Sequence, residues 1–109
     1  MSAGSPKILR LLGLGLRGRL VTVGVDRTRE AAFKGDLKLA IVAADTAVNS
    51  RDKIVPLLMA RGVTMIATDS AEALGRSVGR ATTAVVGVLD AKLARGIRAA
   101  HEDRENLGE

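Results

Sequence analysis

The sequence predicts an α/β domain in which helices cover both faces of a parallel or mixed sheet of about four strands. Segments with helical periodicity alternate along the chain with short β-rich segments, which is the pattern of that fold class. The 109 residues are enough for one domain with one core. Hydrophobic residues make up 47% of the chain, and Phe33 is its only aromatic residue, so a core of Val, Leu, Ile and Ala is expected.

The first predicted element is a helix that begins at Ser5. Serine is a preferred N-cap residue, and Pro6 then takes the first helical position, where proline is favoured. Gly18 is expected to end the helix, because glycine tolerates the left-handed conformation. Gly13 and Gly15 fall inside this helix, where each costs roughly 1 kcal/mol relative to alanine. We therefore expect these two glycines to allow another element to pack closely against the helix.

The next part of the chain predicts two strands with a helix between them. A strand over residues 20–23 ends at Gly24, and a helix over residues 26–34 ends at Gly35. The following run, residues 37–45, is continuously apolar and contains β-branched residues. Such a run is typical of a strand that is buried on both faces of a sheet.

Capping residues locate the next two helices. Asn49 and Ser50 are good caps for a helix that ends at Gly62. Asp69 and Glu72 have the spacing of a capping box at the start of another helix. The remaining boundaries follow from apolar and β-branched runs and from amphipathic spacing: a strand over 63–67, a helix over 69–78, a strand over 82–90 and a helix over 91–100.

Three of the glycines also match a cofactor-binding pattern. Gly13, Gly15 and Gly18 fit G-x-G-x-x-G, the pattern of a dinucleotide-binding loop. In such a loop the glycines follow a strand and open a helix, so that the pyrophosphate meets the helix N-terminus. Here the glycines precede the first predicted strand. The pattern is therefore read as helix packing and capping, and no cofactor is expected.

Catalytic and metal sites are not expected either. The chain has no cysteine, which excludes a thiol nucleophile, a disulfide and a Cys-bearing zinc site. A Ser/His/Asp triad would have to use the only histidine, His101, beside the acidic tail. Asp45 and Asp52 lack the ligand spacing of a metal loop and are read as capping or strand-end residues. The chain is therefore predicted not to be an enzyme.

The net charge of +5 is unevenly distributed. Residues 1–38 contain eight Lys or Arg against three acidic residues, whereas residues 101–109 are acidic. A basic region suits a polyanionic partner, because phosphate contacts release counterions; a solvated basic surface is the alternative. No apolar run approaches the roughly 20 residues that cross a bilayer, and the N-terminus does not read as a signal peptide. We expect a cytoplasmic protein without membrane contact.

Four stretches carry a resemblance to a known family: "LLGLGLRGRLVTVG", "GDLKLAIVAAD", "RDKIVPLLMARGV" and "ALGRSVG". In this order they resemble the L-seven-Ae/L-thirty-e family of ribosomal proteins and its bacterial members, from about Ile8 to Ile97. The resemblance implies a three-layer α/β/α sandwich with a mixed sheet of about four strands, forming one domain over 1–100 before a tail over 101–109. It also implies a role in RNA binding, because many members bind the kink-turn, a sharply bent RNA motif with tandem sheared G·A pairs.

The resemblance places RNA contacts at the N-terminus of the second helix and in the loop after the fourth helix. The family motif at the helix is Gly-x-Asn-Glu-x-x-Lys, and this chain has "GVDRTRE". Gly24 agrees, whereas Asp26, Arg27 and Glu30 stand where Asn, Glu and Lys are typical. In the loop, Arg80 replaces an apolar residue. The implied RNA-binding set is Gly24, Val25, Asp26, Arg27, Arg29, Glu30, Arg80, Ala81 and Thr82.

These departures change the chemistry of the motif. Arg27 cannot accept hydrogen bonds from guanine, and Glu30 would repel phosphate. Asp26 keeps its acceptor capacity but adds negative charge. In partial compensation, Arg27 and Arg29 lie near a helix N-terminus, which favours phosphate, and arginine donates well to phosphate or to guanine O6 and N7.

The sequence therefore predicts a non-enzymatic protein that binds structured RNA, either kink-turn-like or ribosomal, as part of a ribonucleoprotein. DNA is not an expected partner. The alternative is a non-enzymatic protein-interaction module of the same fold that has lost kink-turn binding, and a protein partner is then expected. A third hypothesis, an enzyme that acts on a nucleotide-like ligand, requires a cleft with convergent polar groups.

Overall fold

Helices and strands alternate along the chain in the computed structural model, which describes residues 5–107 and gives only the backbone for residues 104–107. The order is α1 (Pro6–Arg17), β1 (Val21–Val23), α2 (Val25–Lys34), β2 (Leu39–Val42), α3 (Val48–Ala60), β3 (Met65–Ala67), α4 (Ala71–Ser77), β4 (Val85–Val88) and α5 (Ala91–Leu107). The predicted order of elements is therefore confirmed. Within the described residues, no helix is long and apolar enough to span a bilayer.

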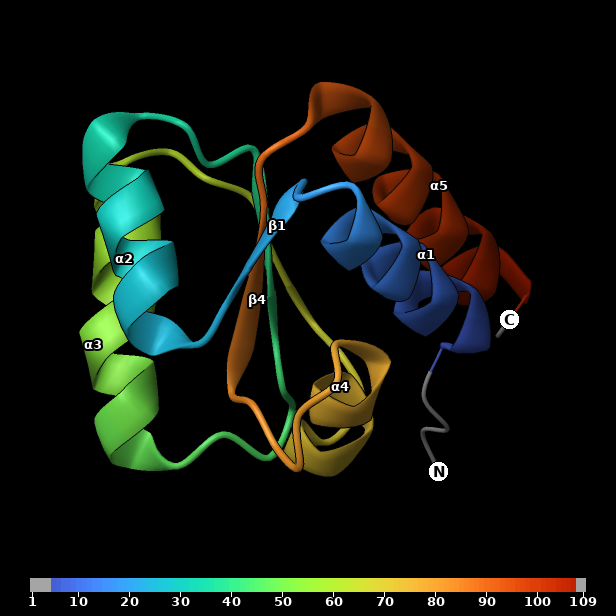
Figure 1. Ribbon diagram of the computed structural model, residues 1–109, viewed down its shortest axis with the longest axis horizontal. Helices are drawn as coiled ribbons and strands as arrows, with labels where there is room; N and C mark the ends of the chain where they lie inside the picture. The colour runs from blue at the N-terminus through green and yellow to red at the C-terminus, as the bar shows by residue number, and fades with distance from the viewer. Residues whose placement is uncertain (1–4, 108–109) are drawn as a thin grey trace.

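The four strands form one mixed sheet in the order β1-β4-β2-β3. β4 is antiparallel to both of its neighbours, β1 and β2, and β2 is parallel to β3. Helices α2 and α3 cover one face of the sheet, and α1, α4 and α5 cover the other (Figure 1). The prediction of a three-layer α/β/α sandwich with a four-stranded mixed sheet is confirmed.

The core is divided by the sheet into two apolar clusters. Alternate residues of a strand point to opposite faces, so Leu39 and Ile41 of β2 pack with α1, α4 and α5. Ala40 and Val42 of the same strand pack with α2 and α3. All four residues of β2 are buried, as predicted for a strand covered on both faces.

The glycines of α1 have the packing role that the sequence predicted. A Cβ atom at Gly15 would lie 2.5 Å from Leu93 Cδ2 of α5, and one at Gly13 would lie 3.0 Å from the Ser77 carbonyl oxygen of α4. The two glycines therefore let α1 pack closely against both neighbouring helices. Ser5 caps α1 by accepting from the Ile8 N–H at 3.4 Å. Gly18 is the C-cap, as expected, but its φ of −87° is not left-handed, and the next residue, Arg19, has a φ of +60°.

Two predicted helix starts are wrong: the N-cap of α3 lies two residues before Asn49, and the N-cap of α4 lies one residue after Asp69. α3 begins at Val48 with Ala47 at the N-cap position, so Asn49 and Ser50 lie in the first turn and do not cap it. The carbonyl of Ala47 already accepts the Arg51 N–H, which closes the first turn before either capping residue is used.

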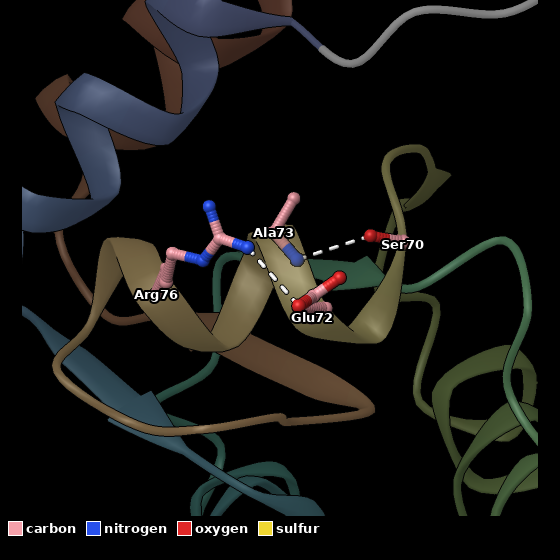
Figure 2. A network of polar contacts seen from close by, with 4 residues as sticks. All are labelled: Ser70, Glu72, Ala73 and Arg76. Atoms are coloured by element: carbon pink, nitrogen blue, oxygen red, sulfur yellow. Dashed lines mark hydrogen bonds and ion pairs between the residues drawn. The ribbon is translucent and has the colours of Figure 1, made fainter.

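The second displaced start is that of α4. Its N-cap is Ser70, whose hydroxyl oxygen accepts from the Ala73 N–H at 3.0 Å (Figure 2). Asp69 precedes the cap with a φ of +62° and accepts from the Ser5 N–H at 2.9 Å instead. Asp69 thus bonds to the residue before α1, and Ser70 caps α4, so the capping box predicted for Asp69 and Glu72 does not form.

Several elements differ from the prediction in length. β2 covers only Leu39–Val42 of the predicted 37–45, and β3 covers only Met65–Ala67 of the predicted 63–67. β4 begins at Val85, so residues 82–84 belong to the connection that precedes it. α5 continues to Leu107 and does not end near residue 100, so the described part of the acidic tail is helical. Residues 1–4 and 108–109 of the predicted domain and tail lie outside the described residues.

Candidate nucleic-acid interface

Three connections between elements meet at one end of the sheet, at the bottom of Figure 1. Because β4 is antiparallel to β1 and β2, the start of β4 lies beside the ends of both strands. The Gly24 N–H donates to the Val85 carbonyl at 2.9 Å, and the Ala43 N–H donates to the Ala84 carbonyl at 2.8 Å. We call the segments 24–27, 43–47 and 79–84 together the loop end. The two regions that the family resemblance singled out are thus neighbours here.

The junction between β1 and α2 depends on Gly24. Its backbone has a φ of +97° and a ψ of 163°, a conformation that side chains other than glycine rarely adopt. The residue occupies the N-cap position of α2, and no side-chain hydrogen bond caps the helix there. The first N–H groups of an α-helix have no partner within the helix and attract anions. Gly24, the position at which this chain matches the family motif, therefore has a backbone conformation that requires glycine.

Thr28 anchors the first turn of α2 to the sheet. It lies within "GVDRTRE" but is fully buried, and its hydroxyl is 2.9 Å from the hydroxyl of Thr22 in β1. Gly87 of β4 leaves the space for this pair, because a Cβ there would lie 2.5 Å from Thr22 Oγ1. Thr28 is not among the residues that the family resemblance implied. Its three-residue spacing from the half-buried Val25 and from the buried Ala31 was the available signal.

The orientation of Thr28 leaves Asp26, Arg27 and Glu30 exposed to solvent. Glu30 forms an ion pair with Lys34, four residues later, with Oε2 and Nζ 3.7 Å apart and both side chains about two-thirds exposed. Exposed pairs of this kind contribute little stability. The pair nevertheless puts a positive charge beside the carboxylate that was expected to repel phosphate.

The two arginines of the motif point in different directions. They are two residues apart, which is about 200° around a helix. Arg27 is exposed and lines a hollow that continues past the end of α2 to Asp36 and Leu89, away from the loop end. Arg29 donates to the Lys53 carbonyl of α3, and its guanidinium lies 5.5 Å from the centre of the Phe33 ring. The structure therefore does not bring Arg27 and Arg29 together, and Arg29 instead connects α2 to α3.

The connection between α4 and β4 runs back along α4. Gly79 turns the chain with a φ of +76°, and the Arg80 N–H then donates to the Gly75 carbonyl at 2.8 Å. Thr82 lies directly against the helix, because a Cβ at Gly75 would be only 2.6 Å from Thr82 Cα. Arg80, Ala81 and Thr82 are exposed, and the chain enters β4 at the loop end.

The connection between β2 and α3 also belongs to the loop end, although the sequence analysis did not include it in the site. Val48, the first residue of α3, is 69% exposed. Asp45 accepts from the Ala71 N–H at 2.8 Å and so caps α4, in agreement with its interpretation as a capping residue. Sequence order alone gave no sign of this proximity, since Asp45 and Ala71 are 26 residues apart.

Comparisons with known proteins support the resemblance. The model of the ribosomal protein L7Ae/L30e/S12e/Gadd45 family matches residues 7–97. The structure of a protein with unknown function from Bacillus halodurans is similar to the chain, with 28% identity, a TM-score of 0.80, and coverage of 86% of this chain and 95% of that one. The Giardia lamblia 15.5kD RNA binding protein has the same fold, with 21% identity, a TM-score of 0.76, and coverage of 93% and 87%. A comparison with curated proteins finds no match.

Proposed function

The chain belongs to the ribosomal protein L7Ae/L30e/S12e/Gadd45 family, which includes kink-turn RNA-binding proteins, and from this premise we propose that it binds structured RNA through the loop end. The RNA is a kink-turn-like or ribosomal element, and the protein acts without enzymatic activity. The observation that carries the proposal is the hydrogen bond between the Gly24 N–H and the Val85 carbonyl. It holds the start of α2 beside the α4–β4 connection, so one RNA can contact both.

Arginine donors replace the acceptors of the family motif in this proposal. Arg27 and Arg80 are both exposed, and each presents a planar guanidinium that suits phosphate oxygens or guanine O6 and N7. The first N–H groups of α2 add a second source of phosphate contacts. Asp26 remains available as an acceptor for guanine amino groups. The Lys34 counter-charge reduces the repulsion between Glu30 and phosphate.

A binding assay with two matched RNAs tests the proposal. One RNA contains a kink-turn with tandem sheared G·A pairs, and the other has Watson–Crick pairs in their place and stays unbent. We expect the kink-turn to bind at least about tenfold more tightly, a difference of ~1.4 kcal/mol. The affinity should fall with salt at a slope of roughly −0.9 per phosphate contact. Equal and weak affinity for both RNAs would reduce the interaction to unspecific electrostatics and refute the proposal.

Single arginine variants locate the contact. Arg27→Ala and Arg80→Ala are each expected to weaken kink-turn binding and to lower the salt slope by about one phosphate contact. Arg95→Ala removes the same charge from an exposed position on α5, which begins beyond β4 at the opposite end of the sheet. It should leave binding nearly unchanged. A loss with Arg95→Ala as large as with the other two would place the contact elsewhere.

A second candidate function follows from the departures at Asp26, Arg27 and Glu30. If they have abolished kink-turn binding, the same fold serves as a non-enzymatic protein-interaction module. The triple variant Asp26→Asn, Arg27→Glu, Glu30→Lys restores the family-typical residues and separates the two functions. Tight kink-turn binding by the triple variant alone, together with a partner retained by the natural chain after nuclease treatment, would establish the second function.

A further inference from the structure

An open groove lies between α1 and α4, on the face of the sheet opposite to α2 and α3. Its volume is about 580 Å³, and the surface that lines it is mainly apolar. Leu9 and Gly13 of α1 and Ala73 of α4 are among its lining residues. A Cβ at Gly13 would lie 3.0 Å from the Ser77 carbonyl oxygen, so α1 and α4 are in contact at this point along the groove.

Two leucines of α1 leave much of their surface uncovered beside this groove. Leu14 is 55% exposed and Leu16 is 37% exposed, and both line the groove. The buried positions of the helix, Ile8, Leu12 and Gly15, lie on its other side against the core. Single exposed leucines are common on protein surfaces. Leu14 and Leu16 are two residues apart, about 200° around the helix, so they lie at opposite edges of the groove-lining side of α1, with Leu9 and Gly13 between them.

Arginines line the groove together with these apolar residues. Arg10 and Arg17 of α1 and Arg76 of α4 line the groove, and none of its described lining residues is acidic. Figure 2 shows the side chains of Arg76 and Ala73 on the side of α4 that is turned toward α1. Arg76 forms an ion pair with Glu72 at 3.0 Å, with side chains 74% and 68% exposed. Such an exposed pair is weak, so another carboxylate can replace Glu72 at little cost.

From the charge complementarity of this groove we propose that it binds an acidic amphipathic segment of a partner protein. Apolar side chains three or four residues apart would lie on the leucines, and Asp or Glu would lie beside the three arginines. The α1 residues of the groove extend from Leu9 to Arg17, about 12 Å along a helix. A segment of two to three helical turns matches this length. Nucleic acid fits less well, because it would use only the arginines and leave the leucines uncovered.

The absence of cysteine allows a clean crosslinking test. Leu14→Cys introduces a single thiol in the groove for a benzophenone label, and Met59→Cys does the same at a position that is 75% exposed on α3. Labelled proteins are irradiated in a nuclease-treated extract of the source cells, and the crosslinked peptides are sequenced. We expect position 14, but not position 59, to capture protein segments with acidic residues between apolar residues at helical spacing.

A charge reversal decides whether the arginines are responsible. Arg10→Glu with Arg17→Glu, made in the Leu14→Cys background, should lower capture at least about tenfold, equivalent to ~1.4 kcal/mol. Circular dichroism confirms that this variant is folded, and its kink-turn affinity should be unchanged. The proposal is overturned if position 14 captures nothing beyond the position 59 control, only a second copy of this chain, only RNA fragments, or segments whose capture survives the charge reversal. None of these outcomes depends on RNA binding at the loop end.

Discussion

Replacing Gly75 by alanine is expected to destabilise the protein, although alanine is the better helix former. The added Cβ would lie 2.6 Å from Thr82 Cα, 2.7 Å from its carbonyl carbon and 2.8 Å from its nitrogen. All three are backbone atoms, so no side-chain rotation relieves the overlap. Overpacking of this kind costs typically about 1–3 kcal/mol, and a backbone obstacle favours the upper end. Against a gain of ~1 kcal/mol in helix propensity, the net loss is ~2 kcal/mol.

Urea and thermal unfolding of this variant measure the loss. For a domain of this size ~2 kcal/mol corresponds to a melting temperature lowered by roughly 8 °C. Gly96→Ala is the matched control, because Gly96 also lies within a helix, α5, but a Cβ there meets only Leu11 Cδ1 at 4.0 Å. That variant should be more stable than the natural chain by up to about 1 kcal/mol. Equal shifts of the two variants in the same direction would refute the reasoning.

The same substitution has a consequence at the proposed interface. Thr82 must move away from α4, and Arg80 and Ala81 belong to the same exposed connection. Kink-turn affinity measured at a temperature where the variant is folded should therefore fall, and affinity should be unchanged in Gly96→Ala. If Gly75→Ala loses stability but keeps its full affinity, the α4–β4 connection does not contact the RNA.

Substitutions at three further positions test the supports of the loop end by urea unfolding. Gly24→Ala forces a side chain into a backbone with a φ of +97° and should cost about 1–3 kcal/mol; no loss would show that α2 tolerates another start. Thr28→Val keeps the volume but removes the bond to Thr22 and should cost ~1 kcal/mol; a neutral effect would mean that packing alone anchors α2. Asp69→Ala removes the acceptor of the Ser5 N–H and replaces a residue that tolerates a φ of +62°, so it should cost ~2 kcal/mol. Asp69→Asn keeps the acceptor and tolerates the same φ, so its loss should stay within ~1 kcal/mol. Equal losses in the two variants would argue against this role of the Asp69 side chain.

The order of the elements could be predicted because it depends on local patterns. Hydrophobic periodicity and the glycines at positions 18, 24 and 35 defined the first two helices and the strand between them. The caps of α3 and α4 could not be predicted, because the choice of cap depends on distant contacts. Asp69 is occupied by the N–H of Ser5, 64 residues earlier. Asp45 caps the start of α4 from the far end of β2.

The candidate site was predictable only in part, for a similar reason. Both segments named by the family resemblance lie at the loop end, but their proximity follows from β4 being antiparallel to β1 and β2. No pattern in the sequence predicts which strands pair, so the β2–α3 connection could not be included in the predicted site. The divergence of Arg27 and Arg29 follows from helix geometry once α2 is placed, whereas the contact of Arg29 with α3 requires the packed structure.

Small residues support the loop end in a way that both candidate functions share. Gly75 lets the α4–β4 connection lie on α4, and Gly87 makes room for the pair formed by Thr22 and Thr28. Gly75 accommodates the backbone of Thr82 and Gly87 accommodates side chains, and neither contact involves the residues that depart from the family motif. The departures therefore change which groups are exposed at the start of α2 and leave the supporting framework in place. An intact framework is compatible with both candidate functions, and the triple variant distinguishes them, because only altered recognition leaves the natural chain with kink-turn affinity of its own.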